Sequence, residues 1–114
     1  ISHAMNLGMY DFFPLKAGKG PAVQFLQAKW GLAADECIAL FDDDNDIKMV
    51  EQCGAGFLPG ITSESVQSRL ALEPGWALAK RAGTGVFATE DILQTILDEV
   101  EERNQILKED PVSV

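Results

Sequence analysis

Four carboxylates and one amide stand within five residues, in the stretch Asp42-Asp43-Asp44-Asn45-Asp46. Two unit charges about 4 Å apart repel by roughly 4 kcal/mol at an effective dielectric constant near 20, so such a cluster is costly when it is partly buried. A partly buried cluster therefore binds a cation, takes up protons or receives a lysine or arginine. Two interpretations stay open on these residues alone, a divalent-cation site and an acidic turn on the surface.

The acidic stretch directly follows an apolar segment, residues 37–41, which is typical of a buried strand. Further strands are predicted at 8–15, 57–60 and 76–80, and helices at 21–30, 47–53, 63–72 and 89–107. This alternation predicts an α/β fold, a mostly parallel sheet with flanking helices. Ligands bind beyond the carboxyl ends of the strands in such sheets, which is where the acidic stretch lies.

Local signals predict where several of these helices begin and end. Gly31 is expected to stop the first helix, Ser63 to cap the third and Thr89 to cap the last. The last helix is expected to bury one apolar face, made of Ile92, Leu93, Ile96, Leu97, Val100 and Leu107. We expect residues 1–8 to be disordered or foreign to the natural chain, 9–108 to form one core and 109–114 to be a loose tail.

The chain has 114 residues and a net charge of −9, which predicts one domain and argues against a general nucleic-acid binder. It shows neither a membrane span nor a signal peptide. Cys37 and Cys53 have the spacing of neither a zinc site nor a disulfide framework. We therefore expect two buried thiols in a cytoplasmic protein that does not bind membranes.

Two common motifs fail on inspection. An EF-hand loop that begins at Asp42 has Ile47 at its glycine position and Cys53 at its glutamate position. A dinucleotide-binding fingerprint at residues 83–88 has no later strand to carry the acid that binds ribose.

One ordered set of motifs does fit. Lys19-Gly20-Pro21-Ala22-Val23 opens a predicted helix, and Phe41-Asp42-Asp43-Asp44-Asn45-Asp46-Ile47-Lys48-Met49 follows about twenty residues later. Together with residues 53–60 and 83–86, these motifs resemble the C-terminal part of the core domain of haloacid dehalogenase-like phosphohydrolases. The resemblance covers residues 9–102 and is closest to the branch of Cof-type and sucrose-phosphate-type sugar phosphatases. Phe41 and Asp43 depart from the glycine and serine that are usual there.

The resemblance implies a role for each of four residues. Asp42 would be an Mg²⁺ ligand, and Asp46 a second acid of the metal site that acts through water or by orienting Lys19. Lys19 would neutralise the phosphate and the aspartyl nucleophile, and Asn45 would hydrogen-bond the phosphate or a metal-bound water. These roles agree with the need of phosphoryl transfer for charge neutralisation.

The family's nucleophile lies in an Asp-x-Asp-x-Thr/Val motif after the first strand of its core. Reading Asp42 to Asp46 as that motif puts an acid at the Thr/Val position and Lys19 on the wrong side. The resemblance thus implies part of an Mg²⁺-dependent phosphatase that acts on a small phosphorylated metabolite, a sugar phosphate, through an aspartyl-phosphate. The nucleophile strand and the cap would be missing, so we expect this chain to be inactive alone and to self-associate through exposed surface.

Two other functions remain as alternatives. One is a non-catalytic α/β interaction domain whose acidic loop is merely on the surface. The other is a receiver-like phosphoacceptor domain, which requires an acid pair near the first strand, where the sequence offers only Asp11.

Overall fold

The computed structural model describes residues 1–6 and 8–109, apart from the side chains of residues 6, 11 and 13. The strands are β1 (Ser2–Asn6), β2 (Met9–Phe13), β3 (Ile38–Leu40), β4 (Ala55–Leu58) and β5 (Trp76–Leu78). The α-helices are α1 (Lys19–Trp30), α2 (Ile47–Val50), α3 (Glu64–Leu70) and α4 (Val86–Glu109). Two 3-10 turns, η1 (Ala34–Glu36) and η2 (Asp44–Asp46), precede and follow β3.

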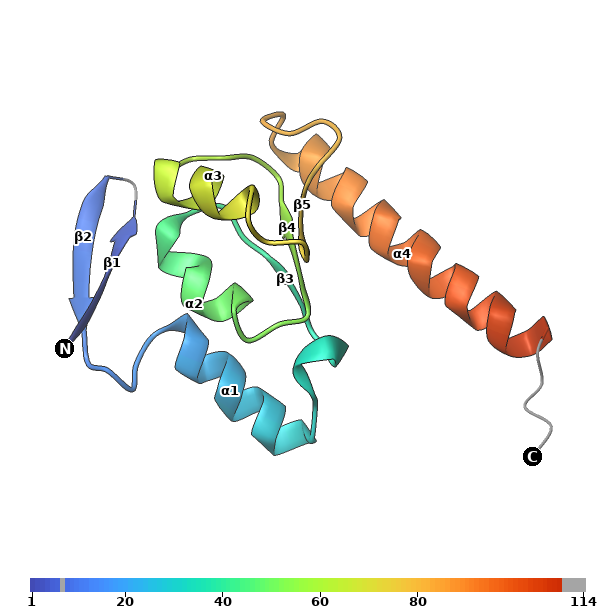
Figure 1. Cartoon of the computed structure of the whole chain (residues 1–114), viewed down its shortest axis with the longest axis horizontal. Coiled ribbons are helices and arrows are strands. Elements are labelled where there is room, and N and C mark those ends of the chain that lie inside the picture. Colours follow the sequence, from blue (N-terminus) through green and yellow to red (C-terminus); the bar gives the residue numbers. More distant parts are fainter. Residues whose placement is uncertain (7, 110–114) are drawn as a thin grey trace.

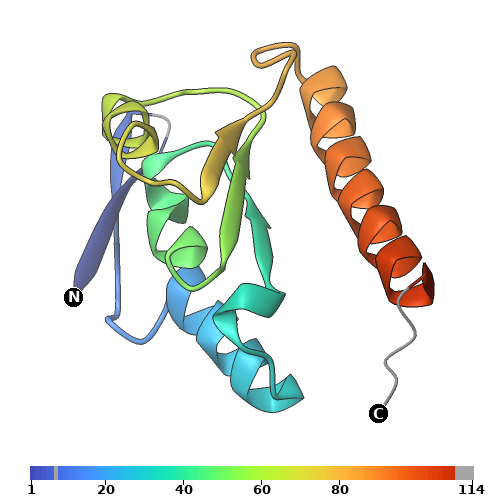
Figure 2. The ribbon, with the colours of Figure 1, turned by 45° about the vertical axis from the view of Figure 1, so that its right-hand side comes forward.

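The central sheet is parallel, with the strand order β3-β4-β5. Helices α1, α2 and α3 lie on one side of it and α4 lies on the other (Figures 1 and 2). This arrangement confirms the predicted α/β class with a parallel sheet between helices. In the described residues, β3 pairs only with β4, so it forms one edge of the sheet.

Side chains of alternate strand residues reach the two faces of the sheet, as the pleat requires. The first face, with α2 and α3, holds the buried residues Ala39, Phe41, Val50, Leu58 and Val66. On the second face, Leu40 and Phe57 pack against a smaller cluster made of Ala79, Ala88 and Ile92. Both clusters lie beside the strand end from which the acidic loop departs.

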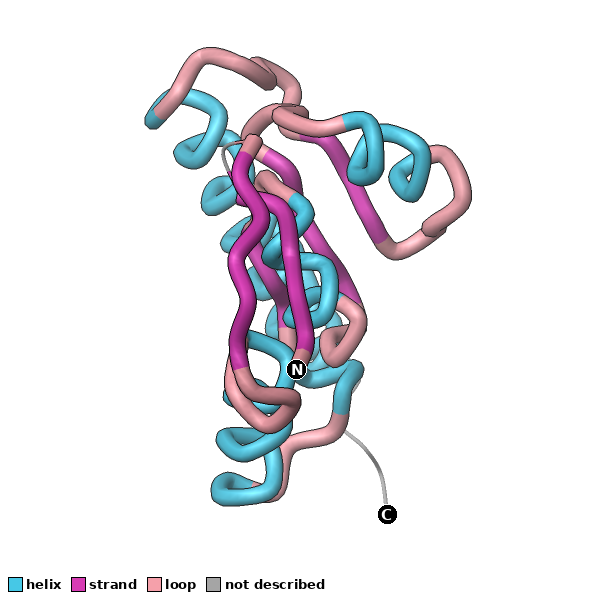
Figure 3. The backbone as a smooth tube through the Cα atoms, turned by 90° about the vertical axis from the view of Figure 1, so that its left-hand side faces the viewer, coloured by secondary structure: helices cyan, strands magenta, loops and turns pink. Residues whose placement is uncertain are grey.

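The first two strands form an antiparallel hairpin outside the central sheet, with Ser2 opposite Phe13 and Asn6 opposite Met9. Figure 1 shows this hairpin beside the rest of the chain, and in the view of Figure 3 it lies in front. Residues 1–8 were expected to be disordered or foreign to the natural chain. Disorder does not hold for Ser2–Asn6, which form β1, and the second alternative stays a prediction. The predicted strand at 8–15 exists as β2, but it pairs with β1 and does not join the parallel sheet. A hairpin between neighbouring strands closes a shorter loop than the crossover that a parallel pair requires.

Helix α4 begins at Val86, three residues before the predicted cap, so Thr89 lies inside the helix. Ala88 and Ile92 are buried where α4 meets the sheet, and Ile96 packs against the same cluster, while the end of the helix extends beyond the sheet (Figure 1). The predicted apolar face is only partly covered, since Leu93, Leu97, Val100 and Leu107 are 48–65% exposed. The predicted tail, beyond Glu109, lies outside the described residues.

Other local predictions hold. Gly31 ends α1 in the left-handed region with φ 65°, and the Ser63 hydroxyl caps α3 by accepting the N–H of Val66. Cys37 and Cys53 are free thiols, but they are partly rather than fully buried. No helix in the described part of the chain is both long and apolar enough to cross a bilayer.

Candidate active site

The acidic loop begins where β3 ends, and it is folded around the Asp46 carboxylate. Asp46 is only 5% exposed. Its Oδ2 accepts the backbone N–H groups of Asp42, at 3.3 Å, and Asp43, at 3.5 Å. The Asp43 carboxylate caps η2 by accepting the N–H of Asp44 at 2.7 Å. Backbone donors thus stabilise two of the four clustered charges, which explains how the loop tolerates them.

Lys19 reaches this loop from the first residue of α1. The preceding Gly18 has a φ of 105°, a backbone conformation that favours glycine. Gly20 is buried against α2, where an added Cβ would lie 3.0 Å from the Lys48 carbonyl oxygen. This close approach places the first turn of α1 beside the loop, and the Lys19 ammonium donates to Asp46 Oδ1 in an ion pair.

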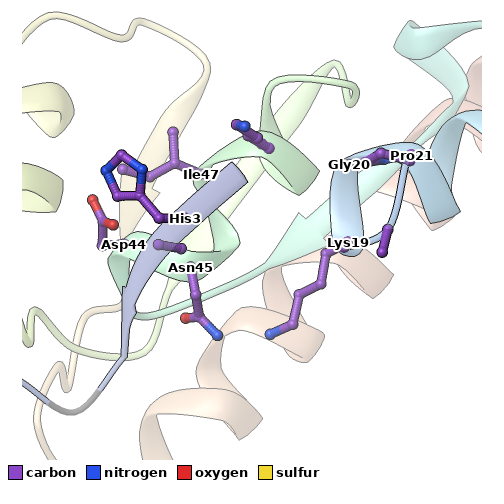
Figure 4. Close-up of a pocket in the computed structure, with 11 residues that line it drawn as sticks. His3, Lys19, Gly20, Pro21, Asp44, Asn45 and Ile47 are labelled. Carbon is purple, nitrogen blue, oxygen red and sulfur yellow. The ribbon is translucent and has the colours of Figure 1, made fainter. Parts of the chain in front are cut away.

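Lys19 and Asn45 line one pocket of about 260 Å³ at the start of α1. Figure 4 shows their side chains pointing toward one another across it. Lys48 lines the same pocket and donates from Nζ to the Ser2 hydroxyl at 2.8 Å. Two lysines, one amide donor and the backbone of a helix start thus surround a space suited to an anion such as phosphate.

Asp42 is the exposed carboxylate of the loop. Partial loss of solvent around the Asp42 carboxylate raises its pKa, and the nearby carboxylates of Asp46 and Asp43 raise this pKa further, while Lys19 lowers it. The Thr62 hydroxyl fixes the backbone here by donating to the Asp42 carbonyl at 2.6 Å. A hard divalent cation would relieve the crowding of negative charge at Asp42, and carboxylate oxygen is the donor that Mg²⁺ prefers.

The two acids expected at the metal are used differently. Asp42 offers an exposed carboxylate, whereas both oxygens of Asp46 already accept, from Lys19 and from the loop backbone. The geometry of Asp46 therefore suits a residue that orients Lys19 better than a direct ligand of the metal. In residues 1–6 and 8–109, no group of three or more His, Cys, Asp or Glu side chains is arranged to hold a metal. Asp42 fits Mg²⁺ as one carboxylate ligand, and the described residues do not place two further acidic ligands beside it.

The structure thus brings together all four predicted residues, Lys19, Asp42, Asn45 and Asp46. It also adds His3 and Lys48, which line the pocket and were not predicted. Lys48 lies in α2, directly after the acidic loop, and this closeness in sequence could have identified it as a pocket residue. His3 gave none, because its approach to the loop depends on the hairpin.

Comparisons with known proteins identify the family. The family model described as haloacid dehalogenase-like hydrolase matches residues 3–71, which include Lys19 and the whole acidic loop. The kanosamine-6-phosphate phosphatase of Bacillus subtilis (strain 168) is 38% identical over 48 residues, or 42% of this chain. The aligned stretch spans only 17% of that relative. No solved structure matches the chain. Because the family model covers more than half of its residues, the chain belongs to the haloacid dehalogenase-like hydrolases.

Proposed function

We propose that this chain forms part of an Mg²⁺-dependent phosphatase that hydrolyses a small phosphorylated metabolite, a sugar phosphate, through an aspartyl-phosphate. Family membership supports the hydrolase class. The similarity to a phosphatase named for kanosamine 6-phosphate supports the phosphate ester and the sugar. The observation that carries the proposal is the Lys19 ammonium, which Asp46 holds at a pocket shared with Asn45.

Each residue then has a task that its surroundings support. Lys19 neutralises the charge of the phosphate as a positioned cation, and its ion pair with Asp46 fixes its direction. Asn45 donates a hydrogen bond to the phosphate from the opposite wall of the pocket. Asp42 binds Mg²⁺, which would neutralise a further part of the phosphate charge.

The nucleophile is the part that these residues do not supply. Asp46 is engaged by Lys19 and the loop backbone, and Asp43 is buried in its capping contact. We propose that the nucleophilic aspartate comes from outside the 114 residues and that the chain alone does not turn over. Incubation with p-nitrophenyl phosphate and Mg²⁺ tests this, since steady release of nitrophenol that Asp42→Asn abolishes would contradict it.

Binding of phosphate can be tested without turnover. We expect inorganic phosphate, with Mg²⁺ present, to produce saturating NMR shifts at the amides of Lys19 and Asn45. Lys19→Ala should weaken this binding at least about tenfold, since a charge-assisted hydrogen bond contributes about 1.5–3 kcal/mol. Lys16→Ala is the matched control, because Lys16 is an exposed lysine three residues before Lys19. Equal effects of the two substitutions, or no saturation, would favour an interaction domain with an acidic surface loop.

A further inference from the structure

A second and larger cavity, of about 630 Å³, lies beside the Lys19 pocket. The two share His3 and Asp44 in their linings, so they are neighbours with a common wall. The second cavity lies between the β1–β2 hairpin, the acidic loop and residues 62–65. A phosphate ester whose phosphate sits at Lys19 therefore has room on this side for the alcohol that carries it.

The shared wall is held in place by Asp44. Its Oδ2 accepts the backbone N–H of Met5 in the hairpin at 2.9 Å. Its Oδ1 accepts the Ser65 hydroxyl at 3.0 Å. One carboxylate thus ties together the three segments that enclose the cavity, which gives the cavity a defined shape.

The two spaces differ in charge. The Lys19 pocket is lined by two lysines, Lys19 and Lys48, and by one acid, Asp44. The second cavity is lined by three acids, Asp43, Asp44 and Glu64, and no lysine or arginine is among its described lining residues. A negative charge is therefore favoured in the first space and opposed in the second.

The rest of the lining suits a molecule rich in hydroxyl groups. Thr62, Ser63 and Ser65 line one side. The hydroxyls of Thr62 and Ser65 already donate to the Asp42 carbonyl and the Asp44 carboxylate, so they remain available as acceptors for the hydroxyl groups of a ligand. On the other side Tyr10 lies near His3, with ring centroids 6.0 Å apart, and its ring is exposed. Carboxylates and hydroxyls hydrogen-bond sugar hydroxyls, and an aromatic ring packs on the apolar C–H face of a sugar.

From these observations we infer that the second cavity binds the alcohol part of the substrate, a polyol that carries no second negative charge, and that it prefers one bearing an ammonium group. The inference rests on the proposed function, since it needs the phosphate at Lys19. It goes further by assigning selectivity for the alcohol to Glu64, Asp44 and the hydroxyls around them. Substrates with a carboxylate beside the phosphate are the class that this cavity rejects.

Two matched pairs of ligands test the inference by calorimetry on the whole chain with Mg²⁺ present. Sorbitol 6-phosphate and 6-phosphogluconate differ by one carboxylate, and glucose 6-phosphate and glucosamine 6-phosphate differ by one ammonium. We expect the carboxylate to weaken binding about fivefold or more and the ammonium to strengthen it by a similar factor. A factor of five corresponds to about 1 kcal/mol, the interaction of two unit charges about 4 Å apart in water.

Glu64→Gln should reduce both preferences at least about twofold while leaving the affinity for inorganic phosphate unchanged. Glu99→Gln, an exposed acid on α4, is the matched control and should leave both preferences intact. If phosphate binds through Lys19 but each pair binds equally, the inference is overturned and the proposed function stands. Failure of inorganic phosphate itself to bind would overturn both.

Discussion

Replacing Lys19 with alanine is expected to destabilise the fold by about 1–2 kcal/mol. The substitution leaves the Asp46 carboxylate, whose side chain is only 7% exposed, without its ammonium partner. A hydrogen bond to a charged group contributes about 1.5–3 kcal/mol. Two effects reduce this value. Lys19 is 52% exposed, so water already competes for it, and a cation in the first turn of α1 opposes the helix dipole by about 0.3–1 kcal/mol.

Urea unfolding at neutral pH measures this change, and a double-mutant cycle with Asp46→Asn isolates the pair. We expect a coupling free energy of about 1 kcal/mol between the two sites. Lys16→Ala, at the exposed lysine before α1, should change stability by less than about 0.5 kcal/mol. A coupling near zero, or a Lys19→Ala variant as stable as the wild type, would refute the idea that Asp46 holds Lys19.

Three further outcomes are expected. Gly56→Ala should cost about 1–3 kcal/mol in thermal or urea unfolding, because its Cβ would lie 2.5 Å from Val50 Cγ2, and a normal stability would contradict this packing. The raised pKa of Asp42 means that the folded chain holds the carboxyl proton of Asp42 more tightly than the unfolded chain does. The stability that this proton contributes is therefore present below pH 3.8 and is lost as the pH rises through the folded pKa. Without metal, Asp42→Asn should therefore match the wild type near about pH 3 and be the more stable form near about pH 6, and a constant difference in unfolding free energy would be inconsistent with the shift. We propose self-association through the β3 edge, where Ile38 is 45% exposed; sedimentation should show association that Ile38→Lys reduces, and a monomer at high concentration would exclude it.

Local chemistry explains which features the sequence revealed. Gly31 and Ser63 act within one turn of their helices, so their effects do not depend on the rest of the fold. The acidic loop was recognisable because its residues are adjacent in sequence. The lysine that approaches it, 27 residues away, was found through the family's motif order rather than through any local rule.

Two features were missed, one local in the sequence and one that depends on packing against the sheet. Ser2–Asn6 and Met9–Phe13 form a hairpin, yet residues 1–8 were expected to be disordered or foreign to the natural chain, and His3 was not among the predicted site residues. The apolar residues of α4 were predicted to form one buried face, but only part of that face meets the sheet. The contact runs along Ala88, Ile92 and Ile96, whereas Leu97 lies about 140° round the helix from Ile92 and is 49% exposed.

The most direct test of the metal and phosphate site is a titration with Mg²⁺ in the presence of inorganic phosphate, followed by NMR. We predict saturating shifts centred on the amides of Asp42 and Asn45, lost in Asp42→Asn and kept in Asp35→Asn, a substitution at an exposed acid of η1. Non-saturating shifts spread over the surface acids, and equal in both variants, would contradict the site and identify the loop as an acidic surface turn.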